Sequence, residues 1–298
     1  MQTEIKNRIK EAIKADLADG KISQNKLAVK CDVSSGMLSH ICNGAWENIG
    51  EKTWLKLSAF YKLGDTWAIH KTDNFNTIQN LCADTQSVKR MVAISAFSGA
   101  GKTAALTYYA GKNKNVMYVM CNFLMTKKTL INSILKACGL VPCDRVPEGI
   151  EQLKEFVLEN ENPLIILDDA GKLNDTCYRL IQLIYDETEF ACGIVLSGTE
   201  FLKKHVEKMA IKDKMGYSEF YRRIGYWLAL KQPSTRIIGE ILAHNEIKYD
   251  TQLLNSIAMK AKNYGVLRAI ITNAKRMEEP LSVTNLSHMA IGAYEYHN

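Results

Sequence analysis

One short segment constrains the fold of this chain more than any other: the octet AFSGAGKT at positions 96–103. It fits the pattern A/G-x-x-x-x-G-K-S/T and lies between an apolar run, Met91–Ser95, and a helix-favouring stretch, Ala104–Ala110. Glycines at positions 99 and 101 allow a tight turn in which successive backbone N–H groups converge on one point. The N-terminus of the following helix adds partial positive charge there. The octet therefore predicts a strand–loop–helix unit that binds phosphate groups.

The side chains of this loop suit the parts of a nucleoside triphosphate. Lys102 would reach the β- and γ-phosphates, and the Thr103 hydroxyl would bind Mg²⁺. We therefore expect ATP and Mg²⁺ as cofactors. The other residues expected to contact the nucleotide are Ala96, Ser98, Gly99, Ala100, Gly101 and Ala104.

A second aliphatic run ends in two carboxylates about sixty residues later. Pro163–Leu167 is continuously apolar, as a strand buried on both faces would be, and Asp168 and Asp169 follow it directly. Asp168 would hold Mg²⁺, mostly through water. Asp169 stands where a glutamate usually polarises the attacking water, and its side chain is one methylene shorter. We therefore expect slow ATP hydrolysis, or hydrolysis that needs a partner. Taken alone, an acidic pair at a strand end also fits a simple turn.

The rest of the chain reads as one more strand and many helices. Cys192–Ser197 predicts a strand, and a further strand follows the arginine pair at 222–223. Residues 66–90 predict a linker and then an amphipathic helix. Beyond Gln232 the periodicity is helical throughout. The helices predicted there are Thr235–Asn245, Thr251–Lys262, Val266–Glu278 and Thr284–Tyr294.

The first seventy residues predict a small helical bundle. A helix runs to Gly20, Ser23 caps a short helix that ends near Lys30, and Ser35–Cys42 forms another short helix. Two short helices joined by a tight turn are typical of a helix-turn-helix. The stretch resembles the lambda-repressor-like family in Ser23-Gln24, Leu27-Ala28, Val33 and the segment from Ser35 to Gly44.

That resemblance implies contacts to DNA. Gln24 would meet a phosphate, and Lys26 and Lys30 could pair with others. The residues that would face the groove are Ser35, Gly36, Ser39, His40 and Asn43. The second short helix lacks Arg and Lys, so the commonest guanine-reading contact is missing. A role in contacting protein rather than DNA therefore stays open.

The order of these motifs along the whole chain resembles the Mu B-like family of transposon-encoded AAA+ ATPases. The resemblance implies an α/β P-loop NTPase (AAA+) core with a C-terminal helical lid, preceded by a small all-α helix-turn-helix domain. The implied boundaries are 1–66 for the helix-turn-helix domain, 67–230 for the core and 231–298 for the lid. Asp169 departs from the usual glutamate, and Ala96 departs from the usual first glycine of the loop.

The resemblance also implies roles for residues around the nucleotide. Ser197 or Thr199 would touch the γ-phosphate, although Thr199 equally suits the N-cap of a helix beginning near Glu200. Arg222 or Arg223, with Arg223 slightly favoured, would reach the nucleotide of a neighbouring subunit. A surface role for this arginine pair is the alternative. Arg268, in the G-x-x-R segment at 265–268, would contact the γ-phosphate from the lid.

The function implied by the resemblance is ATP-dependent handling of target DNA. Members of the family assemble as homo-oligomeric helical filaments on double-stranded DNA with little sequence preference. They deliver that DNA to a DDE transposase and activate the transposase, which in turn provokes ATP hydrolysis. Four lysines expected in loops beside the first strands are candidates for contacts to the DNA backbone: Lys112, Lys114, Lys127 and Lys128.

Composition fits this reading without proving it. The net charge is +6, and residues 1–66, 67–200 and 201–298 carry +2, −2 and +6, so each subunit could offer DNA only a modest grip. Eight cysteines without C-x-x-C spacing suggest free thiols in a reducing compartment. No apolar run reaches the roughly 18 residues of a membrane span. We expect a cytoplasmic protein without membrane contact.

Three other functions stay open at this level. The chain could be an ATP-gated helix-turn-helix transcription regulator, or a replication or repair ATPase that loads another motor. It could also be a scaffold that switches with nucleotide and does not hydrolyse it. Protection of one discrete DNA site would favour a transcription regulator, whereas uniform protection favours the transposition function. An ATP turnover assay identifies a scaffold that does not hydrolyse ATP.

Overall fold

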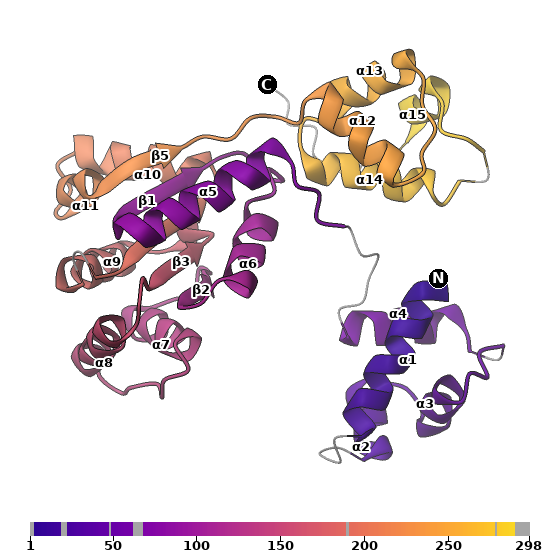
Figure 1. The fold of residues 1–298 in the computed structure, drawn as a ribbon, viewed down its shortest axis with the longest axis horizontal. Helices are drawn as coiled ribbons and strands as arrows, with labels where there is room; N and C mark the ends of the chain where they lie inside the picture. The colour runs from indigo at the N-terminus through magenta and orange to yellow at the C-terminus, as the bar shows by residue number, and fades with distance from the viewer. Residues whose placement is uncertain are drawn as a thin grey trace. The chain divides into compact units, whose positions relative to one another are not determined.

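A computed structural model describes residues 3–18, 23–47, 49–61, 68–188, 191–277 and 279–289 (Figure 1). The chain divides into two compact units, Met1–Ala68 and Ile69–Asn298, and the C-terminal helices belong to the same unit as the sheet. The boundary predicted at residue 66 and the helix end predicted at Gly20 lie outside the described residues. Within the described ranges, none of the helices has both the length and the apolar content to cross a membrane.

The first unit contains four helices around a single apolar core. Their bounds are α1 Thr3–Ala18, α2 Gln24–Lys30, α3 Ser35–Cys42 and α4 Glu51–Phe60. The Ser23 hydroxyl caps α2 by accepting from the backbone N–H of Lys26, as predicted. Asp32, in the left-handed region at φ 53°, turns the chain between α2 and α3. The core is formed chiefly by Ile9, Ile13, Leu27, Leu38, Ile41, Trp54 and Leu57.

The second unit is built on a parallel five-stranded sheet in the order β2-β3-β4-β1-β5. The strands are β1 Met91–Ser95, β2 Val116–Met120, β3 Leu164–Asp168, β4 Gly193–Gly198 and β5 Ile224–Leu228. The strands predicted from the three apolar runs are confirmed to within one residue. The edge strand β2 was not predicted, although the uninterrupted apolar run at 116–121 signals a strand.

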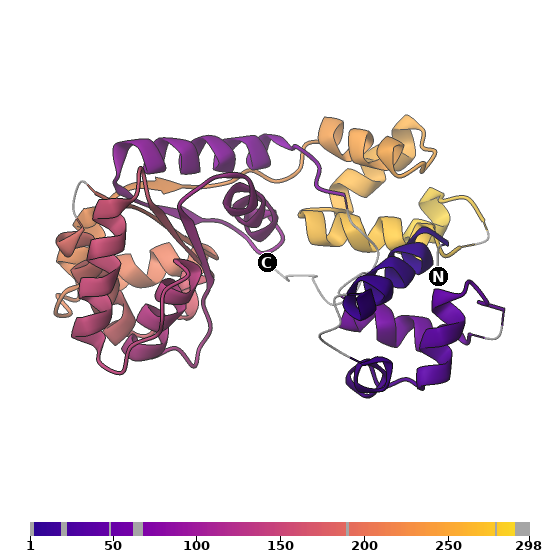
Figure 2. The same cartoon turned by 60° about the horizontal axis from the view of Figure 1, so that its bottom comes forward.

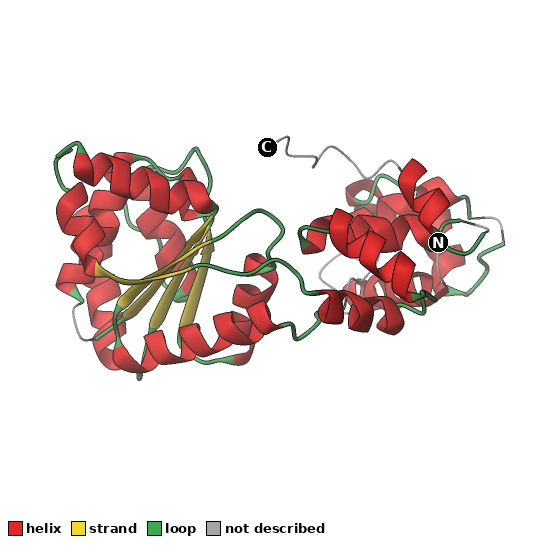
Figure 3. Ribbon diagram, turned by 90° about the horizontal axis from the view of Figure 1, so that it is seen from above, coloured by secondary structure: helices red, strands yellow, loops and turns green. Residues whose placement is uncertain are grey.

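Helices cover both faces of this sheet (Figure 3). The helices α5 (Asp73–Val88) and α6 (Lys102–Lys112) pack on the face that carries Val92 and Ile94. The opposite face, which carries Met91 and Ala93, packs against a larger group of helices (Figure 2). These are α7 Lys127–Ala137, α8 Val146–Glu159, α9 Asp175–Glu187, α10 Glu200–Ile211 and α11 Tyr217–Arg223.

Four more helices follow the sheet: α12 Thr235–His244, α13 Thr251–Lys260, α14 Tyr264–Ala274 and α15 Val283–His288. The predicted helices correspond to these, but three of them end earlier than predicted: α13 at Lys260 rather than Lys262, α14 at Ala274 rather than Glu278, and α15 at His288. α14 begins two residues earlier than predicted, because the Asn263 side chain caps it by accepting from the backbone N–H of Val266. The predicted end of the last helix at Tyr294 lies outside the described residues.

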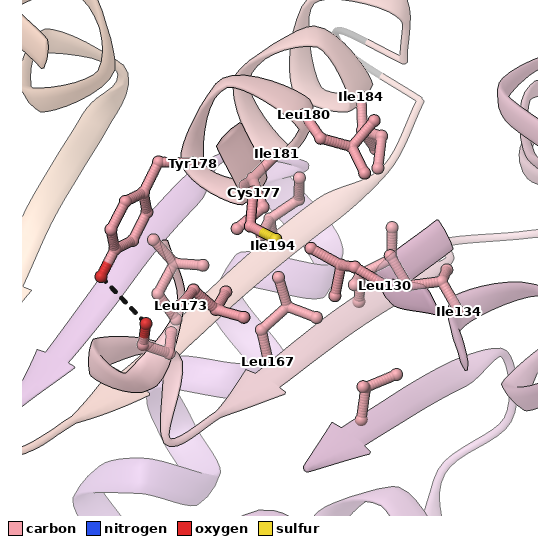
Figure 4. Close-up of a cluster of buried hydrophobic side chains, with 14 of the residues drawn as sticks. Leu130, Ile134, Leu167, Leu173, Cys177, Tyr178, Leu180, Ile181, Ile184 and Ile194 are labelled. Carbon is pink, nitrogen blue, oxygen red and sulfur yellow. Dashed lines mark hydrogen bonds between the residues drawn. The ribbon is translucent and has the colours of Figure 1, made fainter. Parts of the chain in front are cut away.

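A buried cluster beneath α9 fixes the chain that follows β3 (Figure 4). The Tyr178 hydroxyl donates to the carbonyl oxygen of Ala170 at 2.9 Å, within the short 3₁₀ helix η1 (Ala170–Lys172). Leu173 and Cys177 pack in the same cluster. Burial raises the pKa of the Tyr178 phenol, which therefore keeps its proton and its hydrogen bond at neutral pH. This anchors the backbone directly after the predicted acidic pair.

All eight cysteines carry free thiols. Five of these thiols are buried and three are partly exposed. Burial raises the pKa of Cys82 and Cys192 to about 12, so these two thiols are protonated and unreactive at neutral pH.

Candidate nucleotide-binding site

The carboxyl ends of the parallel strands bring several predicted residues to one edge of the sheet. The glycine-containing loop follows β1, the acidic pair ends β3, and Ser197 lies near the end of β4. Because β4 lies between β1 and β3, these three segments are neighbours. Ligands bind at this edge in open α/β sheets.

The loop at 96–103 has the geometry of a phosphate cradle. Gly99 and Gly101 have φ of 74° and 88°, in the left-handed region that favours glycine. Gly101 occupies the N-cap of α6, so the helix begins at Lys102, two residues before the predicted start. Lys102 and Thr103 therefore lie in the first helical turn, where free backbone N–H groups can meet an anion.

Lys102 is buried and its ammonium contacts its own loop. The Nζ atom donates to the carbonyl oxygens of Ala96 and Phe97, both at 2.9 Å. Burial lowers the pKa of Lys102, and the nearby carboxylates of Asp168 and Asp169 partly oppose that shift. The positive charge is thus held by carbonyl dipoles, which a phosphate group could replace with full negative charge.

Asp168 is fully buried and its carboxylate is oriented by two donors. One oxygen accepts from the backbone N–H of Asp169 at 3.0 Å, and the other accepts from the Tyr118 hydroxyl at 3.0 Å. Burial, followed by the proximity of Asp168, raises the pKa of Tyr118, so this phenol remains a donor. Tyr118 lies on β2, the strand that was not predicted, and the apolar run at 116–121 was the available signal.

Asp169 has a left-handed backbone and an ionic partner. Its φ and ψ are 56° and 32°, a conformation that Asp tolerates better than residues with longer side chains. The Asp169 carboxylate is 2.7 Å from Nζ of Lys172, three residues further along in η1. The residue predicted to polarise water is therefore engaged by a lysine in this structure.

Ser197 and Thr199, the two predicted γ-phosphate contacts, differ in their surroundings. Ser197 is fully buried, and its hydroxyl has no hydrogen-bond partner among the residues described. Thr199 is exposed at the N-cap position of α10, where its side chain makes no capping bond. Leaving a buried hydroxyl without a hydrogen bond costs about 1–3 kcal/mol. Ser197 is therefore the better candidate of the two to contact a bound nucleotide.

The first turn of α14 lies against the glycine-containing loop. The backbone N–H of Tyr264 donates to the carbonyl oxygen of Gly99 at 2.9 Å. A side chain on Gly99 would place its Cβ 2.7 Å from Oδ1 of Asn263, so only glycine fits there. Arg268, exposed on the same helix, lies one turn after Tyr264. Asn263 and Tyr264 were missed because the predicted helix began at Val266.

The two arginines at the end of α11 lie at the opposite, amino edge of the sheet, directly before β5. Arg223 makes a two-pronged contact with Asp186, with one N–H···O distance of 2.8 Å between Nη2 and Oδ2. Arg222 is exposed and forms no ion pair with any residue that the structure describes. Arg222 rather than Arg223 is therefore available to a second molecule.

The four lysines expected in loops are not arranged that way. Lys112 is the last residue of α6, and Lys127 and Lys128 begin α7, so only Lys114 lies outside a helix. The prediction was wrong because Thr126 and Thr129 form a reciprocal cap that starts α7 directly before the lysine pair. Lys112 and Lys114 precede β2, whereas Lys127 and Lys128 follow it. The two pairs therefore lie at opposite edges of the sheet.

The predicted DNA-contacting residues of the first unit are grouped on α2 and α3. Gln24 donates from its amide to the carbonyl oxygen of Ser35 at 2.7 Å, which ties the starts of the two helices together. Ser35 and Ser39 are partly exposed, and the remainder are exposed: Lys26, Lys30, Gly36, His40 and Asn43.

A nucleotide with Mg²⁺ fits these residues on three observations. The loop has glycines at the two positions where the backbone is left-handed. The Lys102 ammonium bonds to carbonyl oxygens, which phosphate oxygens could replace. The Ser197 hydroxyl has no hydrogen-bond partner among the described residues. The Thr103 hydroxyl and the Asp168 carboxylate are oxygen ligands, the type that Mg²⁺ prefers.

Comparison with known proteins agrees with this geometry. Residues 85–206 match the family model of an AAA domain. No curated protein sequence matches the chain. The solved structure of the replication initiator DnaA bound to AMPPCP and single-stranded DNA is 16% identical, with a TM-score of 0.52, covering 74% of this chain and 65% of that one. ORC2 of Aeropyrum pernix in its ADPNP–ADP complexes is 14% identical, with a TM-score of 0.53, covering 74% and 68%.

A further DnaA structure, from Aquifex aeolicus with AMPPCP bound, is 16% identical with a TM-score of 0.50 and covers 70% of this chain. The chain spans 63–65% of the length of these DnaA chains. At such low identity these likenesses concern the fold. These likenesses and the parallel sheet fit an AAA+ α/β core with a helical C-terminal region, and the AAA-domain match over residues 85–206 with the geometry of the glycine-containing loop supports a P-loop ATPase.

Proposed function

We propose that this ATPase assembles on target DNA with little sequence preference, delivers the DNA to a DDE transposase and activates that transposase. One observation carries the proposal: a P-loop ATPase core and a small helical unit with α2 and α3 joined by a tight turn occur in one chain. The exposed Lys127 and Lys128, at the edge that holds the phosphate loop, add a basic surface. The solved DnaA with bound single-stranded DNA offers a precedent on the same fold.

In this proposal the second unit acts as two modules, a core at 67–230 and a lid at 231–298, after a helix-turn-helix domain at 1–66. Lys102 holds the β- and γ-phosphates, and Arg268 contacts the γ-phosphate from the lid. Thr103 and Asp168 hold Mg²⁺, which when bound neutralises phosphate charge. Tyr118 keeps Asp168 oriented for that role.

Hydrolysis needs a water molecule aligned with the γ-phosphorus, and Asp169 is the group proposed to align it. The water oxygen bonds to the γ-phosphorus while the bond to the β–γ bridging oxygen breaks. ADP leaves with the electron pair of that bond, and Asp169 accepts a proton from the attacking water. Because Lys172 pairs with Asp169, the resting rate should be low.

We expect Arg222 to complete the site of a neighbouring subunit. Arg222→Ala should lower turnover of the assembled protein about 10³-fold, the lower end of measured arginine-finger effects. Nucleotide affinity of dilute protein should be unchanged. Arg223→Ala, which removes an intramolecular contact, is the matched control and should reduce stability instead.

A mixing experiment tests this role in trans. Arg222→Ala subunits have an intact Asp169, and Asp169→Asn subunits, which keep Lys102 to bind ATP and assemble, have an intact arginine. Mixtures of the two inactive variants should regain a quarter or so of wild-type turnover if active sites form between subunits. If the mixtures are as inactive as either variant alone, Arg222 does not act across an interface.

Nuclease footprinting on random-sequence duplex DNA tests the proposed function against its rivals. With ATP we expect uniform protection, and affinity that falls steeply between 50 and 200 mM salt because backbone contacts release counterions. The likeness to DnaA gives a replication-loading role some support, and that role also predicts binding without a fixed site. Protection of one discrete site would instead support a transcription regulator, and affinity that ignores salt would refute backbone contacts.

A further inference from the structure

Two large apolar side chains stand in solvent at the carboxyl edge of the sheet. Phe123 is 78% exposed and Leu124 is 89% exposed, in the loop between β2 and α7. The loop that holds them is fixed. Asn122 accepts from the backbone N–H of Leu124 at 2.9 Å, and Asn174 donates to the carbonyl oxygen of the buried Met125 at 3.1 Å. Their exposure is therefore built into the fold.

Lysines lie near this apolar pair, and one of them, Lys128, also pairs with the exposed Asp144 at 3.1 Å. Lys127 and Lys128 follow Phe123 and Leu124 on the first turn of α7, and Nζ of Lys172 lies 5.9 Å from the centre of the Phe123 ring. An exposed Phe–Leu pair beside ammonium groups is suited to duplex DNA, whose phosphates attract the cations while apolar side chains wedge between base steps in the minor groove. The surface formed by Phe123, Leu124, Lys127, Lys128 and Lys172 is called the loop patch below.

Lys172 belongs to both the loop patch and the nucleotide site. Its ammonium is 2.7 Å from the Asp169 carboxylate and within cation–π range of Phe123. The Tyr178 hydrogen bond to Ala170 holds the backbone between the two charged residues. The Lys172 and Asp169 side chains are 39% and 30% exposed, and an ion pair this accessible contributes only about 0–1 kcal/mol. A phosphate group arriving at Phe123 could therefore compete for the lysine.

We propose that Lys172 couples DNA binding to ATP hydrolysis: DNA on the loop patch draws the Lys172 ammonium away from Asp169 and frees that carboxylate to align water. The coupling rests on the proposed function, because it takes duplex DNA as the partner and Asp169 as the hydrolytic acid. In this scheme the ion pair between Lys172 and Asp169 keeps ATP hydrolysis slow until DNA binds. Lys172 acts as a positioning residue, through Asp169.

The coupling predicts a change in DNA affinity without any nucleotide. Because Asp169 and DNA compete for Lys172, Asp169→Asn should tighten binding of a fluorescent random-sequence duplex about threefold, measured by anisotropy. Lys172→Met and Phe123→Ala should each weaken it about fivefold. Lys154→Met is the matched control, since Lys154 forms a 2.8 Å pair with Glu187 at similar exposure on helices that do not carry the loop patch. It should change affinity less than twofold.

The same variants predict a change in turnover. Lys172→Met should raise ATP hydrolysis without DNA at least fivefold, and adding duplex DNA should then stimulate it less than twofold. Lys154→Met should behave as wild type. Thermal unfolding of each variant checks that the fold is intact.

The outcomes separate the coupling from the proposed function. If wild-type protein binds DNA and is stimulated by it while Lys172→Met responds equally, the coupling alone is wrong. Unchanged DNA affinity of Phe123→Ala would also overturn it, including the case in which that variant instead loses binding to a protein partner. If wild-type protein does not bind duplex DNA, the proposed function fails as well. A raised basal rate of Lys172→Met would then show only that Lys172 restrains Asp169.

Discussion

Lys102→Ala is expected to lower the affinity for ATP at least a hundredfold, equivalent to about 2.7 kcal/mol. The ammonium of Lys102 is the buried cation of the phosphate loop, and charge-assisted hydrogen bonds to phosphate are worth about 1.5–3 kcal/mol each. Titration with a fluorescent ATP analogue measures the loss.

The variant also leaves the carbonyl oxygens of Ala96 and Phe97 without their donor, so its thermal stability must be measured in parallel. Lys204→Ala, an exposed lysine on α10, is the control and should bind ATP as wild type. If Lys102→Ala assembles on DNA in an ATP-dependent way, the assignment of the phosphate loop is refuted.

Trp54→Ala is expected to unfold the first unit and leave the ATPase unit folded. Trp54 is fully buried in the four-helix core and stacks edge-on with Trp46 at 5.6 Å between ring centroids. Truncating a buried aromatic side chain costs about 3–5 kcal/mol. A single core of this size supplies no more than about 3–5 kcal/mol of stability. Urea unfolding should therefore lose one transition.

ATP affinity of Trp54→Ala should be unchanged, because residues 69–298 form a separate compact unit. Val29→Ala, which shortens an exposed side chain on α2, is the control and should retain both transitions. Loss of DNA binding in Trp54→Ala alone would show that the first unit contributes to that binding. If both variants keep both transitions, the proposed dependence of this unit on its buried core is wrong.

The parts of the fold that sequence reasoning found were those with strong local signals. A continuous apolar run predicts a buried central strand, and β1, β3 and β4 each have one. Ser23 fixes the start of α2 through its side-chain cap, as predicted. The edge strand β2 also has such a run, at 116–121, but that run was not interpreted as a strand, so Tyr118 and its bond to Asp168 were missed.

Other features of the site depend on contacts between segments that are distant in the sequence. The spacing of apolar residues along a sequence does not predict such contacts. Asn263 lies 164 residues after Gly99 in the sequence, and the two meet only because the start of α14 packs on the loop. The pairing of Arg223 with Asp186 likewise joins two helices, α11 and α9. That contact is what distinguishes Arg223 from its sequence neighbour Arg222.

The backbone conformation at position 169 suits Asp better than the usual glutamate. A left-handed backbone at φ 56° is tolerated by Asp and Asn, whose short side chains can bond locally, and costs other residues about 1–2 kcal/mol. The shorter carboxylate also lies within reach of Lys172. Slow ATP hydrolysis was predicted from the length of the Asp169 side chain alone. The ion pair with Lys172 would slow hydrolysis for a second reason, and this ion pair can open.

Electron microscopy of the full chain on random-sequence duplex DNA, with and without ATP, tests the central claim most directly. The account predicts continuous protein-coated DNA with ATP and Mg²⁺, and bare or sparsely bound DNA without nucleotide or with Lys102→Ala. Isolated particles at fixed positions, or coating that is the same without ATP, would contradict it.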